Sequence, residues 1–303
     1  MLSGPESYIS VLRGLRETSV VRSHAITLEF VNDTSNTTAL GAALDKADAA
    51  IACGWSFSSE ERDAPSLALQ VGEKDLISTL NVAEPRQVPV VMLIGGRGPV
   101  LTPWRDRLSA MASMVYGGQE AGHGWAAVLT GATNPSGKLI FTWPRVDNQG
   151  PTLCDTSPVK LIPCDYQAKL ADFDTYQQKA EPYEKFGFGL SFTTFEYSGL
   201  SCEAAREHDC TGECPWRASL TVRNTGQLHG SEVVQLYLHH PGALLTRTLA
   251  AFTKIRLAPG EARELTLDAH PLAVNGLLGR NGTHEPLLRD AELRVGQMRC
   301  ALG

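Results

Sequence analysis

The sequence predicts an α/β domain followed by an all-β domain, namely an open, mainly parallel and incomplete α/β sandwich and then a β-sandwich. Apolar runs alternate with stretches of helical periodicity through residues 1–145. In residues 196–303, short segments of alternating polarity are separated by turns. Residues 146–195 hold proline, aromatics and little periodicity, which is typical of a connector. We therefore expect two domains joined by this connector.

The first domain contains repeated strand and helix signals. We expect strands at residues 24–31, 49–54, 89–95, 112–116 and 138–143, and helices at residues 39–48, 72–82, 104–109 and 120–129. The clearest strand, PVVMLIG, is apolar throughout, as expected when helices cover both faces of a parallel strand. In such sheets, ligands bind in the loops beyond the carboxyl ends of the strands. Loops 55–65 and 95–103 follow two of these strands.

The second domain is expected to be made of short antiparallel strands. Turns at residues 224–226 and 259–260 divide this part of the chain. The alternating segments are residues 217–224, 232–240, 249–257, 262–269 and 290–298. Their regular spacing indicates a β-sandwich.

Composition excludes several classes of function. At 303 residues the chain has room for about two domains, and a net charge of −6 with no basic stripe argues against nucleic acid as a partner. No apolar run approaches the roughly 18 residues that span a membrane. The first residues lack the pattern of a signal peptide.

Cysteines and glycosylation sequons indicate an oxidising compartment. Sequons occur at Asn32, Asn36 and Asn281. The chain has seven cysteines, an odd number that leaves at least one thiol unpaired. Three of them, Cys202, Cys210 and Cys214, cluster in a polar insert with His208 between the first two. Their spacing is C-x7-C-x3-C, which differs from the C-x2-C spacing of zinc sites. We expect disulfides, no metal or cofactor, and a secreted or vacuolar protein.

An acidic segment follows the predicted strand 49–54. It reads GWSFSSEERDAPSLAL, and its carboxylates are Glu60, Glu61 and Asp63. A loop at the carboxyl end of a buried strand is where α/β proteins build their sites. The competing interpretation is a solvated loop of surface charges, which is the usual role of such a run.

Several motifs together resemble glycoside hydrolase family 3, the β-glucosidase and β-xylosidase family. They are VYGGQEAGHG and NPSGK in residues 115–138, FGFGLSFTTF in residues 186–195, and V-x-N-T-G, E-V-V-Q-L-Y and L-x-P-G-E in the second domain. The resemblance spans roughly residues 46–298. It implies that the first domain is the C-terminal α/β-sandwich domain of that family, truncated at its N-terminus, and that the second is fibronectin type III-like.

The resemblance assigns a role to Glu60. The family's acid/base loop reads E-G-x-D-R before L-x-L, and matching Asp63 and the L-A-L of residues 67–69 places Glu60 at the acid/base position. Glu61 replaces the usual glycine and is the fallback, and Ala64 replaces the usual arginine. Arg62 is a candidate substitute for that arginine, and Asp63 fits a loop-bracing carboxylate.

Other motifs favour structural roles. The loop at residues 95–99 (GGRGP) lacks both phosphate-binding spacings and resembles the family's turn before P-W, in which Trp104 packs. The Q-E pair at residues 119–120 and the N-P-S-G-K run are expected to shape a helix start and a turn. The eight histidines show no metal-ligand spacing.

The resemblance also implies a partner. Family members carry the aspartate nucleophile on a (β/α)8-type barrel, which needs about 250 residues. The leading hypothesis is a part of a retaining exo-β-glycosidase that hydrolyses O-glycosyl bonds of β-glucosides or β-xylosides in carbohydrate catabolism. The barrel, as a missing domain or a partner chain, would complete it. The alternative is a non-catalytic, carbohydrate-associated or protein-interaction module.

Overall fold

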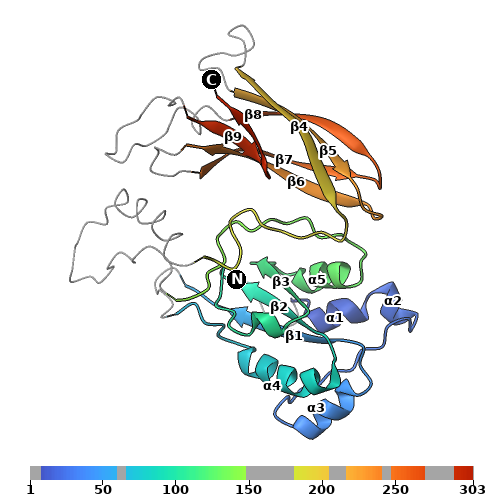
Figure 1. Cartoon of the computed structure of the whole chain (residues 1–303). Helices are drawn as coiled ribbons and strands as arrows, with labels where there is room; N and C mark the ends of the chain where they lie inside the picture. Colours follow the sequence, from blue (N-terminus) through green and yellow to red (C-terminus); the bar gives the residue numbers. More distant parts are fainter. Residues whose placement is uncertain are drawn as a thin grey trace, which may run out of the picture. The chain divides into compact units, whose positions relative to one another are not determined.

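The computed structural model describes residues 8–59, 66–147, 181–204, 216–240, 247–269 and 290–302. The chain divides into two compact units: Met1–Thr133 with Phe141–Asp147, and Asn134–Ile140 with Asn148–Gly303. The first contains a parallel sheet with helices, and the second contains antiparallel strands (Figure 1). The predicted fold class is therefore confirmed.

The sheet of the first unit is parallel and has the order β1-β2-β3. Its strands are β1 (Ala50–Ser56), β2 (Val90–Gly96) and β3 (Ala110–Val115). β2 is buried at every position except Val91, as the uninterrupted apolar run predicted for a strand covered on both faces. β1 lies at an edge, and Ile51 on it is 42% exposed.

Helices pack on this sheet and on one another. They are α1 (Val11–Arg16), α2 (Ser19–Arg22), α3 (Thr37–Leu44), α4 (Glu73–Ala83) and α5 (Ala121–Leu129), with short 3₁₀ turns η2 (Glu84–Arg86) and η3 (Arg105–Arg107). α4 contacts β1 and β2, and its Leu76 and Leu80 are fully buried; α3 packs on α4, and α1 packs on α5. α1 and α5 approach closely at Gly14, where a Cβ would lie only 2.2 Å from Gly122 O. The approach therefore requires glycine at position 14.

Two expected strands do not form. Residues 24–31 form no strand: His24 has a φ of 60° in a turn, the Ile26 amide donates to Val20 O, and Phe30 is 61% exposed. β-propensity does not make a strand where no neighbouring strand accepts the backbone bonds. In residues 138–143, Leu139 exchanges both backbone bonds with the 187–188 turn, and the chain passes between the two units after Ile140. The expected helix at 104–109 shortens to η3.

The second unit is a sandwich of two antiparallel sheets, β10-β9-β6-β7 and β4-β5-β8. The strands are β4 (Phe195–Ala204), β5 (Trp216–Asn224), β6 (Gly230–His239), β7 (Arg247–Leu257), β8 (Ala262–Ala269), β9 (Glu292–Val295) and β10 (Met298–Ala301). β4 was not among the expected strands. The single strand expected at 290–298 is a hairpin, turned at Gly296 with a φ of 57°.

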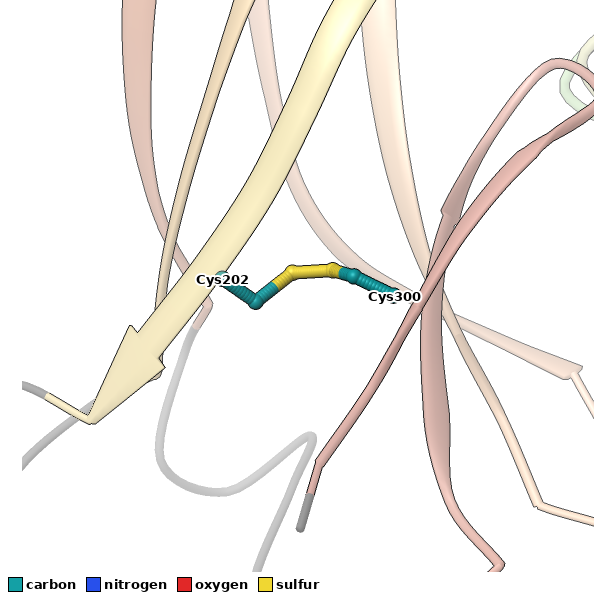
Figure 2. The surroundings of a disulfide bond; sticks show 2 residues. All are labelled: Cys202 and Cys300. Carbon is teal, nitrogen blue, oxygen red and sulfur yellow. A yellow bond between two sulfur atoms is a disulfide. The ribbon is translucent and has the colours of Figure 1, made fainter.

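Alternate residues of both sheets fill one core. Leu220 and Val222 on β5 meet Val234 and Leu236 on β6, and all four are almost fully buried. This is the period-2 alternation that predicted the sandwich. A disulfide joins Cys202 on β4 to Cys300 on β10, with the Cα atoms 6.1 Å apart (Figure 2).

The N-P-S-G-K run belongs to the sandwich unit. The Asn134 side-chain oxygen accepts from the Phe192 amide over 2.8 Å and from Ser191 Oγ over 2.9 Å, while its Nδ2 donates to His229 O. The carboxamide thus joins two segments that are far apart in sequence. This supports the structural role predicted for the motif.

Two further observations concern membrane-spanning helices and thiols. Within the part of the chain that the structure describes, no helix is both long and apolar enough to cross a membrane. Cys53 on β1 is a free thiol. This agrees with the odd number of cysteines, which leaves at least one of them unpaired. Of the insert that we singled out, Cys202 is described, whereas Cys210 and Cys214 lie outside the described residues.

Candidate functional site

The carboxyl ends of β1, β2 and β3 meet at one edge of the sheet, because the strands are parallel. The charged part of the acidic segment, residues 60–65, follows β1 in the sequence. Glu60, Glu61, Arg62 and Asp63 are outside the described residues, so their side chains stay predictions from the sequence. The structure describes the two flanks, which we call the N-terminal stem (residues 57–59) and the C-terminal stem (residues 66–71).

The N-terminal stem is held by two contacts. The Phe57 amide donates to Gln70 Oε1 over 2.6 Å, which ties this stem to the C-terminal one. Ser58 Oγ lies 3.0 Å from the hydroxyl of Tyr116, which directly follows β3. Before the loop begins, Trp55 on β1 exchanges both backbone bonds with Val71, over 3.0 Å each.

The C-terminal stem is held by a carboxylate and a guanidinium. Asp147 accepts from Ser66 Oγ over 2.6 Å and from the Leu67 amide over 3.2 Å. Arg97 Nη2 donates to Ser66 O over 2.8 Å, and the Leu101 amide donates to Leu67 O over 2.9 Å. Side chains from the loop after β2 and from residue 147 therefore fix where the acidic segment ends.

Sequence reasoning missed both anchors. Asp147 is 81 residues from Ser66 and stands in a stretch without periodicity, so no local signal marks it. Arg97 was seen only as part of a glycine-rich loop. The Arg97 Nε is buried and has no hydrogen-bond partner among the described residues. The guanidinium therefore keeps a donor that the Nη2 bond to Ser66 does not use.

The two glycines that end β2 have steric roles, as predicted for this glycine-rich turn. A Cβ on Gly95 would lie 1.9 Å from the Trp55 ring, and one on Gly96 would lie 2.0 Å from Ser56 O. Gly96 also has a φ of 127°, which a side chain rarely permits. Trp104 is 3% exposed and its Nε1 donates to Glu73 Oε1 over 2.8 Å, so it packs as expected.

The Q-E motif shapes the start of α5. Gln119 O accepts from the Ile9 amide over 3.0 Å, and Glu120 is the residue before the first turn of the helix. The Glu120 carboxylate lies 2.6 Å from His123 Nδ1, and Glu17 lies 2.7 Å from His123 Nε2. Both hydrogen bonds raise the pKa of His123, the one from Glu17 most. This cluster joins the end of α1 to α5.

The remaining candidates lie away from the sheet edge. A groove of about 560 Å³ is formed by residues of α1, α2 and α5 and is lined by Glu17, Arg22 and His123 among others, none of which belongs to the loops at the sheet edge. In the described ranges, no three His, Cys, Asp or Glu side chains are grouped to hold a metal ion. His239 and His240 lie at the end of β6, in the other unit.

Comparison with known proteins finds both of the domain types that the sequence predicts. Residues 3–192 match the model of the glycosyl hydrolase family 3 C-terminal domain, and residues 232–275 match that of a fibronectin type III-like domain. The chain is 34% identical over 232 residues to a probable beta-glucosidase J of Neosartorya fischeri, covering 74% of this chain and 26% of that protein. It is also 34% identical over 242 residues to a probable beta-glucosidase H of Aspergillus flavus, covering 76% and 28%. The chain thus spans about a quarter of the curated relatives.

Solved structures show the same fold. Beta-glucosidase 3B from Thermotoga neapolitana, in complex with glucose, superposes with a TM-score of 0.74 at 27% identity, covering 99% of this chain and 47% of that one. DesR, a beta-glucosidase from Streptomyces venezuelae in complex with D-glucose, has a TM-score of 0.71 at 26% identity, covering 86% and 34%. The match to the family model extends over more than half of the 303 residues, so the chain belongs to glycosyl hydrolase family 3.

Proposed function

We propose that this chain supplies the acid/base carboxylate, Glu60, of a retaining exo-β-glycosidase that hydrolyses O-glycosyl bonds of β-glucosides or β-xylosides in carbohydrate catabolism. One observation carries the proposal. The acidic segment lies between two stems that Tyr116, Arg97 and Asp147 anchor at the carboxyl edge of the parallel sheet. A carboxylic acid that must meet a leaving group needs such fixed flanks.

The chemistry requires two carboxyl groups. In a retaining enzyme the acid protonates the oxygen of the leaving group, and it later activates the water that releases the sugar. The second carboxylate, about 5–5.5 Å away, attacks the sugar and forms the covalent intermediate. Enclosure by the substrate and by the barrel would raise the pKa of Glu60 and keep it protonated for the first step.

We further propose that the nucleophile comes from the barrel, as a domain or a partner chain. Among the described residues, the carboxylate that contacts the stems is Asp147, and both of its oxygens already accept hydrogen bonds. It therefore braces the loop. We propose that the α/β domain spans residues 1–145, the connector residues 146–195 and the fibronectin type III-like domain residues 196–303. Without the barrel, this chain is expected to be inactive. We expect the completed enzyme to need no cofactor.

Support for β-glucosides comes from the relatives, which bear the name beta-glucosidase. The non-catalytic alternative draws on two departures from the family pattern, Glu61 in place of glycine and Ala64 in place of arginine. Glycine lets a loop turn freely, whereas a residue with a side chain has fewer backbone conformations open to it. Activity measurements separate the two functions.

The first experiment measures the chain alone. Purified 1–303 is incubated with nitrophenyl β-glucoside and nitrophenyl β-xyloside, with Glu60→Gln as the matched variant. We expect no turnover above the variant. Sustained turnover that disappears in Glu60→Gln would refute the need for a barrel and require a nucleophile within these 303 residues.

The second experiment measures Glu60 in an enzyme completed with the barrel. Glu60→Gln is expected to lower kcat by about 10²–10⁴, the usual contribution of general acid–base catalysis. Azide should partly restore turnover of substrates with good leaving groups. The control is Glu61→Gln, which should retain activity. Loss at Glu61→Gln with normal activity in Glu60→Gln would move the role by one residue, and normal activity in both would favour the non-catalytic module.

We also propose that the protein is secreted or vacuolar. The disulfide between Cys202 and Cys300 supports this, because disulfides persist in oxidising compartments. The sequons at Asn32 and Asn36 lie outside any strand, on exposed or partly exposed residues. Mass spectrometry of the protein from its natural source should find glycan on at least one sequon, and three unmodified asparagines with reduced cysteines would contradict the proposal.

A further inference from the structure

One face of the sheet β10-β9-β6-β7 points away from the core of the sandwich. On β6, the core-facing Val234 and Leu236 alternate with residues that point outward. The β7 residues that pair with these outward positions are Phe252, Lys254 and Arg256. Residues paired across an antiparallel sheet share a face, so these three side chains project outward along one strand. We call them the β7 row.

Further cations reach the same face from the neighbouring strands. The register places Arg294 of β9 beside Tyr237 of β6, and Arg299 of β10 beside Arg294. The chain as a whole has a net charge of −6, so a cationic face departs from its average. The described strands present on this face one carboxylate, Glu292, and the cations Arg247, Lys254, Arg256, Arg294 and Arg299.

The two cations of the β7 row have no acidic partner. The Glu292 carboxylate lies 2.7 Å from Arg294 Nη2 and 3.9 Å from Arg299 Nη1, which places its charge at the other end of the face. Within the described ranges, neither Lys254 nor Arg256 forms an ion pair, and both residues are exposed. Their positive charge is therefore open to a partner.

The ring of Phe252 distinguishes the β7 row from simple protection of a sheet edge. β7 is an edge strand, and lysine on such a strand is a common means of preventing pairing with another chain. Phe252 works against that purpose, because it is 67% exposed on the same row. At that exposure it also contributes little burial to the core. A ring beside two unpaired cations suits a ligand that offers both apolar surface and negative charge.

We propose that the β7 row binds an acidic polysaccharide, a polymer whose sugars carry uronate carboxylates. The guanidinium of Arg256 offers a planar fork of donors that matches a carboxylate, and Lys254 offers a point charge. Phe252 offers a flat surface for the C–H face of a sugar ring. Successive members of the row lie about 6.6–6.8 Å apart, twice the rise per residue of a strand, so an extended polymer that follows β7 meets all three.

The choice of polymer rests on the proposed function. A secreted glycosidase works among polysaccharides, which favours a uronate polymer over nucleic acid, the other polyanion that pairs with cations and stacks on aromatic rings. The row would hold the protein on the polymer while β-glycosides are hydrolysed at the acid/base site. Ile255 separates Lys254 from Arg256, so no run of basic residues marks the row in the sequence.

The first measurement compares three polymers as ligands of 1–303. Affinity electrophoresis uses polygalacturonate as the uronate polymer, hydroxyethyl cellulose as a neutral one, and duplex DNA as the other polyanion. We expect polygalacturonate alone to retard the protein, and the retardation should weaken as salt rises from about 0.02 M to 0.5 M, because salt screens exposed charges. Absence of retardation by polygalacturonate would overturn the inference, as would equal retardation by hydroxyethyl cellulose or tighter binding of DNA.

The second measurement locates the binding on the β7 row. Lys254→Glu and Arg256→Glu keep a charge on the edge strand, and each should lower the affinity for polygalacturonate by about threefold to tenfold, as expected when an exposed charge pair is lost and reversed. Arg223→Glu is the matched control, because it changes the net charge equally at an exposed residue of β5, in the other sheet. It should keep the wild-type affinity. Equal losses in all three variants would overturn the inference, since net charge alone would explain them.

The third measurement tests the ring. Phe252→Ala should lower the affinity by a similar factor at low and at high salt, because stacking is not screened as charge pairs are. Unchanged affinity in Phe252→Ala would overturn the inference. Every variant should keep the Tm of the wild type, since each substituted residue is exposed. No turnover is needed, so Glu60→Gln should bind the polymer like the wild type, and loss of the proposed catalytic role would leave this result unaffected.

Discussion

The Lys138 ammonium lies 2.9 Å from Glu232 Oε1, and the two side chains are only 15% and 9% exposed. Lys138 stands in the N-P-S-G-K run and Glu232 on β6, 94 residues apart. The Tyr197 hydroxyl donates to the same carboxylate oxygen over 2.6 Å, and Lys138 Nζ also donates to Gly189 O over 3.2 Å. Burial and the bond to Glu232 together raise the pKa of Tyr197, so its phenol stays protonated.

Removing one partner of this pair should strongly destabilise the sandwich unit. Lys138→Met leaves the buried Glu232 carboxylate without its cation and with the Tyr197 hydroxyl as its remaining donor, which should lower the free energy of unfolding by about 3–5 kcal/mol. Urea unfolding measures the loss. The control is Arg217→Met, which breaks the more exposed pair with Asp268 and should cost about 0–1 kcal/mol. Equal losses in the two variants would contradict a special role for the buried pair.

The contact of α1 with α5 should depend on pH. Hydrogen bonds from Glu17 and Glu120 raise the pKa of His123, so its contribution is complete below the ordinary value of 6.5 and is lost as pH rises through the raised folded value. The bonds from His123 and then Arg13 lower the pKa of Glu17, so its contribution is present above 4.5 and is lost as pH falls through the lowered folded value. The cluster therefore stabilises most between pH 4.5 and 6.5.

The measurement is the Tm of wild type minus that of His123→Gln across pH 3–9. The difference should be largest near pH 5–6 and should shrink toward both ends. A difference that does not change with pH would show that His123 contributes packing alone.

The disulfide between β4 and β10 should contribute to stability chiefly through the unfolded chain. It closes a loop with a sequence separation of 98, and loss of a native disulfide from a small secreted domain costs about 2–5 kcal/mol. Replacement of Cys202 and Cys300 by serine should lower the free energy of unfolding by that amount. Reducing agent should destabilise the wild type and leave the double variant unaffected. If both proteins respond equally, another disulfide carries the effect.

The chain should self-associate through the edge of its parallel sheet. β1 is an edge strand of the described sheet, and Ile51 on it is 42% exposed, a combination that favours edge-to-edge pairing. Light scattering of 1–303 at high concentration should detect oligomers, and Ile51→Lys should reduce them. Ile140→Lys is the control, since Ile140 is 69% exposed and belongs to no strand. A clean monomer for the wild type would contradict the prediction.

Much of the fold was predictable because its signals are local. The apolar run of β2, the helical spacing of Leu76 and Leu80 in α4, and the alternation along β5 each appear within a dozen residues. The strand wrongly expected at residues 24–31 has a simple cause. Residues 24–31 have strand composition, but a strand exists only where a neighbour accepts its backbone bonds, and composition does not reveal the neighbour.

The candidate site was predictable in part for the same reason. The sequence by itself determined that an acidic segment carrying Glu60 follows a strand, because both lie in one short stretch of the chain. The strand was expected to be buried, but β1 lies at the sheet edge and is buried only at Gly54 and Ser56. Only the tertiary structure decided what anchors the stems: Tyr116 is 58 residues from Ser58, and Asp147 is 81 residues from Ser66. Polar contacts across such distances depend on where parallel strands end in space. Periodicity records which face of an element is buried, and it carries no information about which distant side chain meets that face.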